Sequence, residues 1–199
     1  MPLEVEAKFK VDSHDAVRER LTALGADPLG RVLETNHIFD DAGRTLLAGG
    51  RGLRIRTCRA DRGDDPPATM TYKGPRQPGP LKTREEIEIT LDDPAAGRVL
   101  LERLGFIEAV RFEKRRESWR LEGGQVELDE LPYLGRYIEI EAPDEPAVRR
   151  IQKLIGLAGR ETIRASYIAL LVNHCRQHHL PADRIAFTQV SPGAADHGS

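Results

Sequence analysis

Acidic and basic side chains alternate with apolar ones at the start of the chain. Glu4, Glu6 and Lys8 occupy every second position, with Val5 and Ala7 between them. A period of two is typical of a β-strand with one ionic and one apolar face, on which alternate side chains lie roughly 6.5–7 Å apart. Two carboxylates and an ammonium at that spacing could hold a divalent cation and a phosphate. A solvated edge strand would show the same pattern, so this stretch alone leaves both interpretations open.

Similar ionic faces recur along the chain. One such strand is explained by an outer face in water. When nearly every strand carries one, a second explanation opens, in which the strands close into a barrel with a charged lumen and with apolar faces outward beneath helices. Charges buried in a lumen are very costly unless acids and bases pair or hold a charged ligand. The later ionic positions are Arg54, Arg56, Lys73, Arg84, Glu86, Glu88, Lys114, Arg116, Glu127, Asp129, Glu139 and Glu141.

The residue types on these faces indicate the kind of ligand. Arginine binds phosphate oxygens through a bidentate fork, and lysine binds them as a point charge. Several carboxylates that converge are suited to Mg²⁺ or Mn²⁺, which prefer oxygen ligands. Basic side chains beside a carboxylate-held metal are the usual equipment for polyphosphate chemistry, which depends on positioning and charge neutralisation.

Composition excludes several other classes of protein. The chain has 199 residues, with 30 Lys and Arg against 32 Asp and Glu. This balance lacks the basic excess of a general nucleic-acid binder, so we expect no nucleic-acid partner. No apolar run approaches the roughly 18 residues of a membrane span, and no signal peptide is evident. Cys58 and Cys175 are too few for a disulfide framework, so we expect a cytoplasmic protein without a membrane partner.

The pattern predicts an α+β fold with about eight strands and three or four helices. Ser13 is the expected N-cap of the first helix. We expect one domain over 1–178 and a flexible tail over 179–199. The expected strands are 3–10, 31–40, 52–59, 68–73, 82–91, 106–121, 126–129 and 135–141, and the expected helices are 13–24, 92–104, 144–157 and 165–178.

The order of these motifs resembles the CYTH superfamily, the triphosphate tunnel metalloenzymes. Glu4-Val5-Glu6-Ala7-Lys8 resembles the family's Glu-x-Glu-x-Lys signature, and the other motifs follow in order at strand spacing. They are Leu53-Arg54-Ile55-Arg56, Tyr72-Lys73-Gly74-Pro75, Arg84-Glu85-Glu86-Ile87-Glu88, Lys114-Arg115-Arg116, Asp129 and Glu139-Ile140-Glu141.

The resemblance implies an eight-stranded antiparallel closed β-barrel, the triphosphate tunnel, with flanking helices. It also implies Mg²⁺ or Mn²⁺ and a substrate such as ATP, inorganic triphosphate or thiamine triphosphate; a homodimer is left open. The implied catalytic residues are Glu4, Glu6 and Lys8; the substrate-binding residues are Lys8, Arg54, Arg56, Lys73, Arg84, Lys114 and Arg116; the metal ligands are Glu4, Glu6, Asp129, Glu139 and Glu141; and the supporting residues are Glu86, Glu88 and Glu127.

Two stretches bear on the subgroup. Asn36-His37-Ile38-Phe39-Asp40 stands where the family often has Asp-x-Tyr-Phe-Asp. Arg164-Ala165-Ser166-Tyr167 resembles the ending of class IV adenylate cyclase-like members. The resemblance therefore favours conversion of ATP to cyclic AMP and pyrophosphate. Hydrolysis of inorganic or thiamine triphosphate is the alternative, and a non-catalytic polyphosphate- or nucleotide-binding module is the second alternative.

For several other residues we favour a structural role over a functional one. Arg115 has the opposite parity from its neighbours, so we expect it outside the barrel. His174 and His178 have zinc-like spacing on a helix, but no third ligand is nearby in sequence. Trp119 could stack on a base, although packing within a strand is the commoner role.

Overall fold

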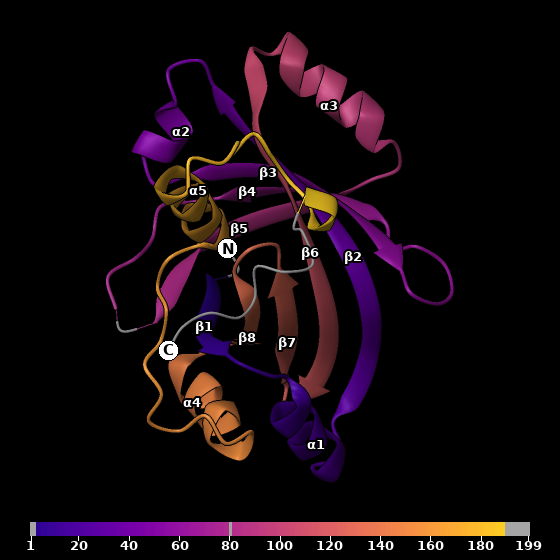
Figure 1. Cartoon of the computed structure of the whole chain (residues 1–199), viewed down its shortest axis with the longest axis vertical. Helices are drawn as coiled ribbons and strands as arrows, with labels where there is room; N and C mark the ends of the chain where they lie inside the picture. The colour runs from indigo at the N-terminus through magenta and orange to yellow at the C-terminus, as the bar shows by residue number, and fades with distance from the viewer. Residues whose placement is uncertain (1–2, 80, 190–199) are drawn as a thin grey trace.

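Eight antiparallel strands close into a barrel in this computed structural model, which describes residues 3–79 and 81–189 (Figure 1). The ring order is β2-β3-β4-β5-β1-β8-β7-β6, and pairing of β2 with β6 closes it. The predicted fold is therefore confirmed. The strands are β1 (Leu3–Val11), β2 (Asp27–Asp41), β3 (Gly52–Ala60), β4 (Ala68–Lys73), β5 (Lys82–Leu91), β6 (Phe106–Leu121), β7 (Gly124–Leu131) and β8 (Gly135–Ala142).

The helices begin where capping residues satisfy their first backbone N–H groups. Asp93 accepts hydrogen bonds from the backbone N–H groups of Ala95 and Ala96, and Asp144 caps the next helix in the same way. Ser13 was expected as a cap, but the N-cap is His14, and Ser13 Oγ accepts only from the N–H of Asp15. The helices are α1 (Asp15–Ala23), α2 (Thr45–Ala48), α3 (Pro94–Arg103), α4 (Glu145–Leu154) and α5 (Tyr167–Gln177).

The main hydrophobic core lies outside the barrel wall. Val5 and Phe9 of β1 join Ile140 of β8 in a buried cluster with Val148 and Ile151 of α4. A smaller cluster joins Phe39 and Ile55 to Leu101 of α3. The apolar faces of the strands therefore point outward beneath helices, as the alternation predicts, and the ionic faces are left for the lumen.

One end of the barrel is sealed by α5. Phe112 of β6 and Tyr137 of β8 share the parity of the ionic residues on their strands, so they point inward. Both belong to a buried cluster with Tyr167 and Leu171 of α5. This apolar plug excludes water from the adjoining charges of the lumen, which strengthens the electrostatic interactions there.

The first part of the stretch expected as a flexible tail packs against the barrel. Strand β9 (Arg184–Ile185) pairs in parallel with β6 at Arg111 and Phe112. Ile185 and Ala186 are buried, which gives this segment a physical reason to dock. A single 3₁₀ turn, η1 (Phe187–Gln189), ends the described chain. The rest of the expected tail, from residue 190, lies outside the described residues.

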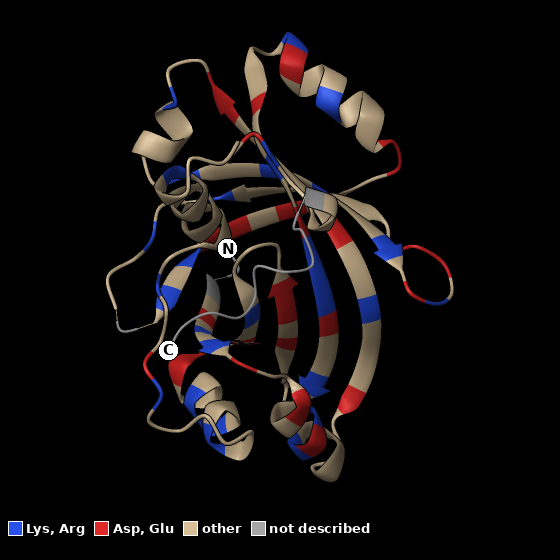
Figure 2. Ribbon diagram, viewed as in Figure 1, with Lys and Arg blue, Asp and Glu red and all other residues tan. Residues whose placement is uncertain are grey.

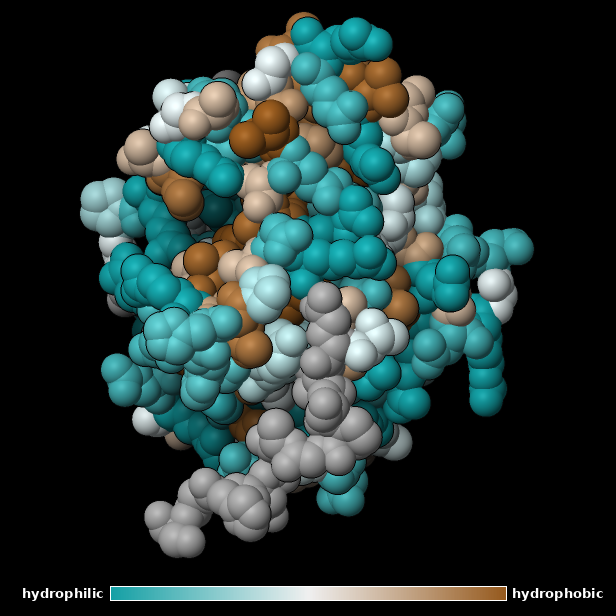
Figure 3. Space-filling model, turned by 45° about the horizontal axis from the view of Figure 1, so that its top comes forward, coloured by the Kyte–Doolittle hydropathy of each residue, from teal (hydrophilic) through white to brown (hydrophobic). Residues whose placement is uncertain are grey.

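The outer surface is largely hydrophilic on the face shown in Figure 3, where hydrophobic residues form separate patches. Leu47 of α2, Leu100 of α3 and Leu104, the C-cap of α3, are among the large apolar side chains that remain exposed. None of the helices within 3–79 and 81–189 combines the length and the apolar character that a membrane span requires.

Gly124 lets strand β7 approach α4 closely. A Cβ at this position would lie 2.6 Å from Ile151 Cδ1 and 2.8 Å from the backbone oxygen of Glu141. We expect Gly124→Ala to lower the free energy of unfolding by ~1–3 kcal/mol through overpacking, as measured by urea denaturation. Gly52→Ala is the matched control, because Gly52 also begins a strand but its nearest atom would be 3.8 Å away. Equal stability of the two variants would contradict this account of the contact.

Candidate active site in the barrel lumen

The lumen gathers acidic and basic side chains from every strand of the barrel. Figure 2 shows how Lys, Arg, Asp and Glu recur along the strands. Lys8, Lys114 and Asp129 are at most 3% exposed. The structure places all the predicted basic residues on this inner face, where they are buried or half-buried. They are Lys8, Arg54, Arg56, Lys73, Arg84, Lys114 and Arg116.

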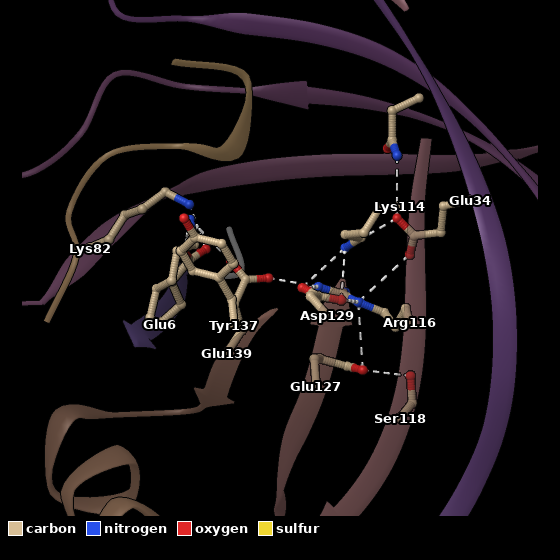
Figure 4. Close-up of polar contacts among 12 residues, drawn as sticks. Glu6, Glu34, Lys82, Lys114, Arg116, Ser118, Glu127, Asp129, Tyr137 and Glu139 are labelled. Atoms are coloured by element: carbon tan, nitrogen blue, oxygen red, sulfur yellow. Dashed lines mark hydrogen bonds and ion pairs between the residues drawn. The ribbon is translucent and has the colours of Figure 1, made fainter. Parts of the chain in front are cut away.

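Arg116 is the centre of the charge network (Figure 4). Its Nε lies 2.7 Å from Asp129 Oδ1, and its Nη2 lies 2.6 Å from Asp129 Oδ2 and 2.6 Å from Glu139 Oε2. Burial alone would lower the pKa of Arg116, but the carboxylates of Asp129, Glu127 and Glu34 raise the pKa well above its ordinary value. Arg116 therefore stays charged, and its planar fork is fixed by three strands.

Glu34 of β2 is a lumen residue that sequence reasoning missed. It is 1% exposed, and its carboxylate lies 3.1 Å from Lys114 Nζ and 3.3 Å from Arg56 Nη1. Burial would raise the pKa of Glu34, but Lys114, Arg56 and Arg116 hold that pKa well below its usual range. The available signal was the parity of β2, because Glu34 and Asn36 alternate with apolar or outward residues.

Asn36 stands where the resemblance leads one to expect aspartate, and it faces the same network. Its side-chain oxygen accepts a hydrogen bond from Arg56 Nε at 3.3 Å, and its amide nitrogen donates to Glu34 at 3.3 Å. Asparagine thus positions Arg56 without neutralising it. The departure from the family pattern leaves more positive charge in the lumen than aspartate would.

The wall formed by β3, β4 and β5 is a second group of ion pairs. Arg54 Nη2 donates to Thr71 Oγ1 at 3.1 Å, and Thr71 in turn donates to Glu88 at 2.7 Å. Glu86 pairs with Lys73 and lies 3.2 Å from Arg84 Nε. Glu86 and Glu88 therefore contact groups that hold the basic side chains of this wall.

Two basic residues of the lumen have lowered pKa values. Burial and the nearby charge of Arg56 lower the pKa of Arg54 to about 10. Burial and the charge of Arg116 likewise lower the pKa of Lys114. An anion bound nearby would raise both pKa values and so favour the charged forms of Arg54 and Lys114.

Carboxylates gather on the wall formed by β1 and β8. Glu6 lies directly opposite Glu141 in the strand register, and Lys8 lies opposite Glu139. Lys8 Nζ is 3.2 Å from Glu139 and 3.8 Å from Glu6. Glu141 is exposed, so this wall runs from the buried interior to the mouth of the barrel.

Lys82 is a second residue that sequence reasoning missed. Its ammonium pairs with Glu6 Oε2, and it is 8% exposed. It begins β5 and has the same parity as Arg84, Glu86 and Glu88, so the alternation of that strand was the signal.

The donor set on β1 and β8 fits a hard divalent cation, because it consists of carboxylate oxygens. In the described part of the chain, however, no three His, Cys, Asp or Glu side chains lie close enough together to bind a metal ion. Asp129 is committed to Arg116 and Lys114 rather than to the other expected ligands. Glu4 lies on β1 with its backbone paired to Arg84, and its side chain lies outside the described structure.

Glu127 lies beside the Arg116 cluster. Ser118 Oγ donates to its carboxylate at 2.5 Å, and Arg116 Nε is 3.7 Å away. Burial raises the pKa of Glu127 more than Arg116 lowers it. The supporting role of Glu127 stays a prediction.

Residues outside the lumen have structural roles. Arg115 points outward to Glu130 at 3.1 Å, as its parity predicts. Trp119 is buried in the outer core and donates a hydrogen bond to Glu117, so it is not available to stack on a ligand in the lumen. His174 stacks between Tyr133 and His178 on α5.

Comparison with known proteins gives concordant results. The CYTH domain family profile matches residues 2–163. A Methanocaldococcus jannaschii protein named putative adenylate cyclase MJ0240 is 29% identical over 177 residues, which cover 84% of this chain and 98% of that protein. The structure of PH1819 from Pyrococcus horikoshii is 30% identical, has a TM-score of 0.74, and is matched over 86% of this chain and 99% of that one.

A third likeness shows the fold alone. HpAC1 from Hippeastrum is 23% identical with a TM-score of 0.65, and the match covers 87% of this chain and 96% of HpAC1. Its structure is described as a putative adenylyl cyclase with a dominant triphosphatase activity. The match of the family profile over most of the chain, on a barrel of this topology, shows that the chain belongs to the CYTH domain family.

Proposed function

We propose that this chain is a divalent-metal-dependent enzyme that binds the triphosphate group of a small molecule in the barrel lumen. One observation supports this most strongly: Arg54 and Arg56 share the inner face of β3, and burial and the charge of Arg56 lower the pKa of Arg54 to about 10. A bound polyphosphate would supply the missing negative charge. Arginines already fixed by Asn36 and Thr71 would bind it with little loss of side-chain entropy.

The metal would be held at the β1–β8 wall. Glu6, Glu139 and Glu141 are the described residues that would supply oxygen ligands, with Glu4 next along β1. Because no three described carboxylates lie close enough together to bind an ion, their side chains would have to move toward it. When bound, Mg²⁺ or Mn²⁺ would neutralise phosphate oxygens and polarise the phosphorus under attack. Lys82 and Arg116, which pair with Glu6 and Glu139, would then be released toward the phosphate oxygens. We assign Asp129 to positioning Arg116 rather than to the metal.

The first candidate reaction is cyclisation of ATP. The ribose 3′-oxygen would attack the α-phosphorus, and pyrophosphate would leave while its oxygens stay bound to the basic side chains of the lumen. The name of the Methanocaldococcus relative, which matches 84% of this chain, supports this candidate.

The second candidate is hydrolysis of a triphosphate, with water as the nucleophile. It is favoured by the placement of aromatic side chains. In the part of the chain that the structure describes, the inward aromatic residues Phe112, Tyr137 and Tyr167 belong to the plug under α5, and Trp119 packs on the outside. A purine at the mouth would therefore lack an aromatic partner, whereas inorganic triphosphate needs none.

A substrate panel separates these candidates. The protein would be incubated with ATP, inorganic triphosphate or thiamine triphosphate, with Mg²⁺ or Mn²⁺, and the products identified. Cyclic AMP and pyrophosphate from ATP indicate the cyclase, and orthophosphate from the other substrates indicates the hydrolase. No turnover of any of the three would contradict the proposed enzyme and leave a polyphosphate-binding module.

Arg56→Ala tests the binding part of the proposal. We expect this variant to bind inorganic triphosphate at least ~10-fold more weakly in titration calorimetry without metal, because a charge-assisted hydrogen bond contributes ~1.5–3 kcal/mol. Arg115→Ala is the control, since Arg115 lies outside the barrel and pairs with Glu130. An unchanged affinity in the Arg56 variant would exclude Arg56 from the binding site.

A further inference from the structure

The segment 163–167, which ends at the first residue of α5, contacts Lys8 at three points. The N–H of Ile163 donates to the backbone oxygen of Lys8 at 2.8 Å. Lys8 Nζ donates in turn to the backbone oxygen of Ala165 at 3.0 Å. The centre of the Tyr167 ring lies 3.9 Å from Lys8 Nζ. Both the backbone and the ammonium of Lys8 are therefore fixed by one short segment, 163–167.

Tyr167 itself is held rigidly in the plug. It is 8% exposed and meets Tyr137 edge to face, with ring centres 5.4 Å apart. Its ring also faces Lys114 Nζ at 5.5 Å, so its π-face lies near two ammonium groups. Burial and the carboxylates of Asp129 and Glu139 raise the pKa of Tyr167 well above its ordinary value, so the phenol stays neutral.

We propose that Tyr167 is a positioning residue, whose ring holds the Lys8 ammonium in the lumen beside Glu139. The role of Lys8 in the reaction rests on the proposed function, but its placement by the ring does not. Lysine is long and flexible, and an unrestrained ammonium would lose rotamer entropy on meeting a phosphate. A desolvated cation over an aromatic face is attracted strongly enough to restrict it. Tyr167 lies beyond residues 2–163, the part that matches the family profile.

The ring contact can be measured without substrate. The chain has lysines at positions 8, 10, 73, 82, 114 and 153, so the side-chain Cε–H signals form a small set in an NMR spectrum. The signal lost in Lys8→Met identifies Lys8. We expect this signal to be shifted upfield in the wild type by the ring of Tyr167, relative to that of the exposed Lys153. The shift should persist in Tyr167→Phe and vanish in Tyr167→Leu.

Tyr133→Leu is the control, because Tyr133 also packs near α5 but stacks on His174. It should leave the Lys8 signal unchanged. Absence of an upfield shift in the wild type, or its persistence in Tyr167→Leu, would overturn the proposal. If the leucine variant does not fold, the presence or absence of the upfield shift of the Lys8 signal in the wild type still tests the contact with the ring.

Kinetics then test the consequence for the reaction. On whichever triphosphate the wild type turns over, we expect Tyr167→Leu to lower kcat about 10-fold with little change in KM, and Tyr167→Phe to restore kcat. In the Lys8→Met background, Tyr167→Leu should have no further effect. Equal losses in both backgrounds would mean that Tyr167 merely supports the fold and would overturn its positioning role. Lack of turnover by the wild type would refute the proposed function, whereas the NMR result would still decide the contact.

Discussion

Glu6→Gln should abolish metal-dependent turnover while the barrel remains folded. Glu6 lies opposite Glu141 on the carboxylate wall, and glutamine keeps its shape but replaces an anionic ligand with a neutral amide. We expect kcat/KM to fall by more than ~100-fold, since groups that only orient a metal ligand already contribute 10–100-fold. The remaining amide oxygen can still accept a hydrogen bond from Lys82, so stability should fall only modestly.

The measurement is product formation as a function of Mg²⁺ or Mn²⁺ concentration, with circular dichroism as the check on folding. Glu130→Gln is the matched control, because it makes the same change on the outer face, where Glu130 pairs with Arg115. Full activity in the Glu6 variant would refute the metal role that we assign to this carboxylate.

Arg116→Met should cause the largest loss of stability among the lumen substitutions. Removing the guanidinium leaves the carboxylates of Asp129 and Glu139 buried without their shortest ion pairs, and it weakens the neutralisation of Glu34. Breaking a buried ion pair from one side costs ~3–5 kcal/mol. Denaturant unfolding of the variant measures this cost. Arg115→Met, one residue away on the exposed face, should change stability by less than ~1 kcal/mol.

The pH dependence of the Arg116 variant gives a second readout. In the wild type, burial opposes ionisation, but nearby cations hold the pKa values of Glu34 and Glu139 well below their usual range. These groups therefore stabilise the wild type above the pKa of the unfolded chain, near 4.5, and their contribution is lost as pH falls through their folded-state pKa values. In the variant, Glu34 and Glu139 have fewer nearby cations to balance their negative charges. Protonation of these carboxylates at low pH removes the unbalanced charge. The stability gap should therefore narrow as pH falls below about 5, and a gap that widens would contradict the assigned pairs.

The ionic faces of the strands could be predicted from the sequence because side-chain parity on a strand is a local property. Glu6 and Arg54 alternate with apolar neighbours, and Arg116 has the same parity as Lys114 on its strand; all three lie in the lumen. Glu34 follows the same rule, but β2 has irregularities at Pro28/Gly30 and Ile38/Phe39, which obscure its parity. Lys82 was missed because it is the first residue of its strand, so the alternating pattern can be followed only in the direction of the later residues.

The ion pairs themselves could not be predicted, because they join residues that are distant in the sequence. Asp129 was expected to bind metal on the basis of its residue type and the family resemblance, yet its fully buried oxygens meet Arg116 and Lys114. The same limit applies to Tyr167, whose position over Lys8 depends on how α5 docks across the barrel end. Local patterns give the residues that face the lumen, and long-range packing selects their partners.

A crystal structure of the protein with inorganic triphosphate, grown without metal, tests the central claim most directly. We predict that the triphosphate lies in the lumen, with its oxygens within about 3 Å of the guanidinium nitrogens of Arg54 and Arg56. Triphosphate bound on the outer face of the barrel, with the lumen ion pairs unchanged, would contradict the claim.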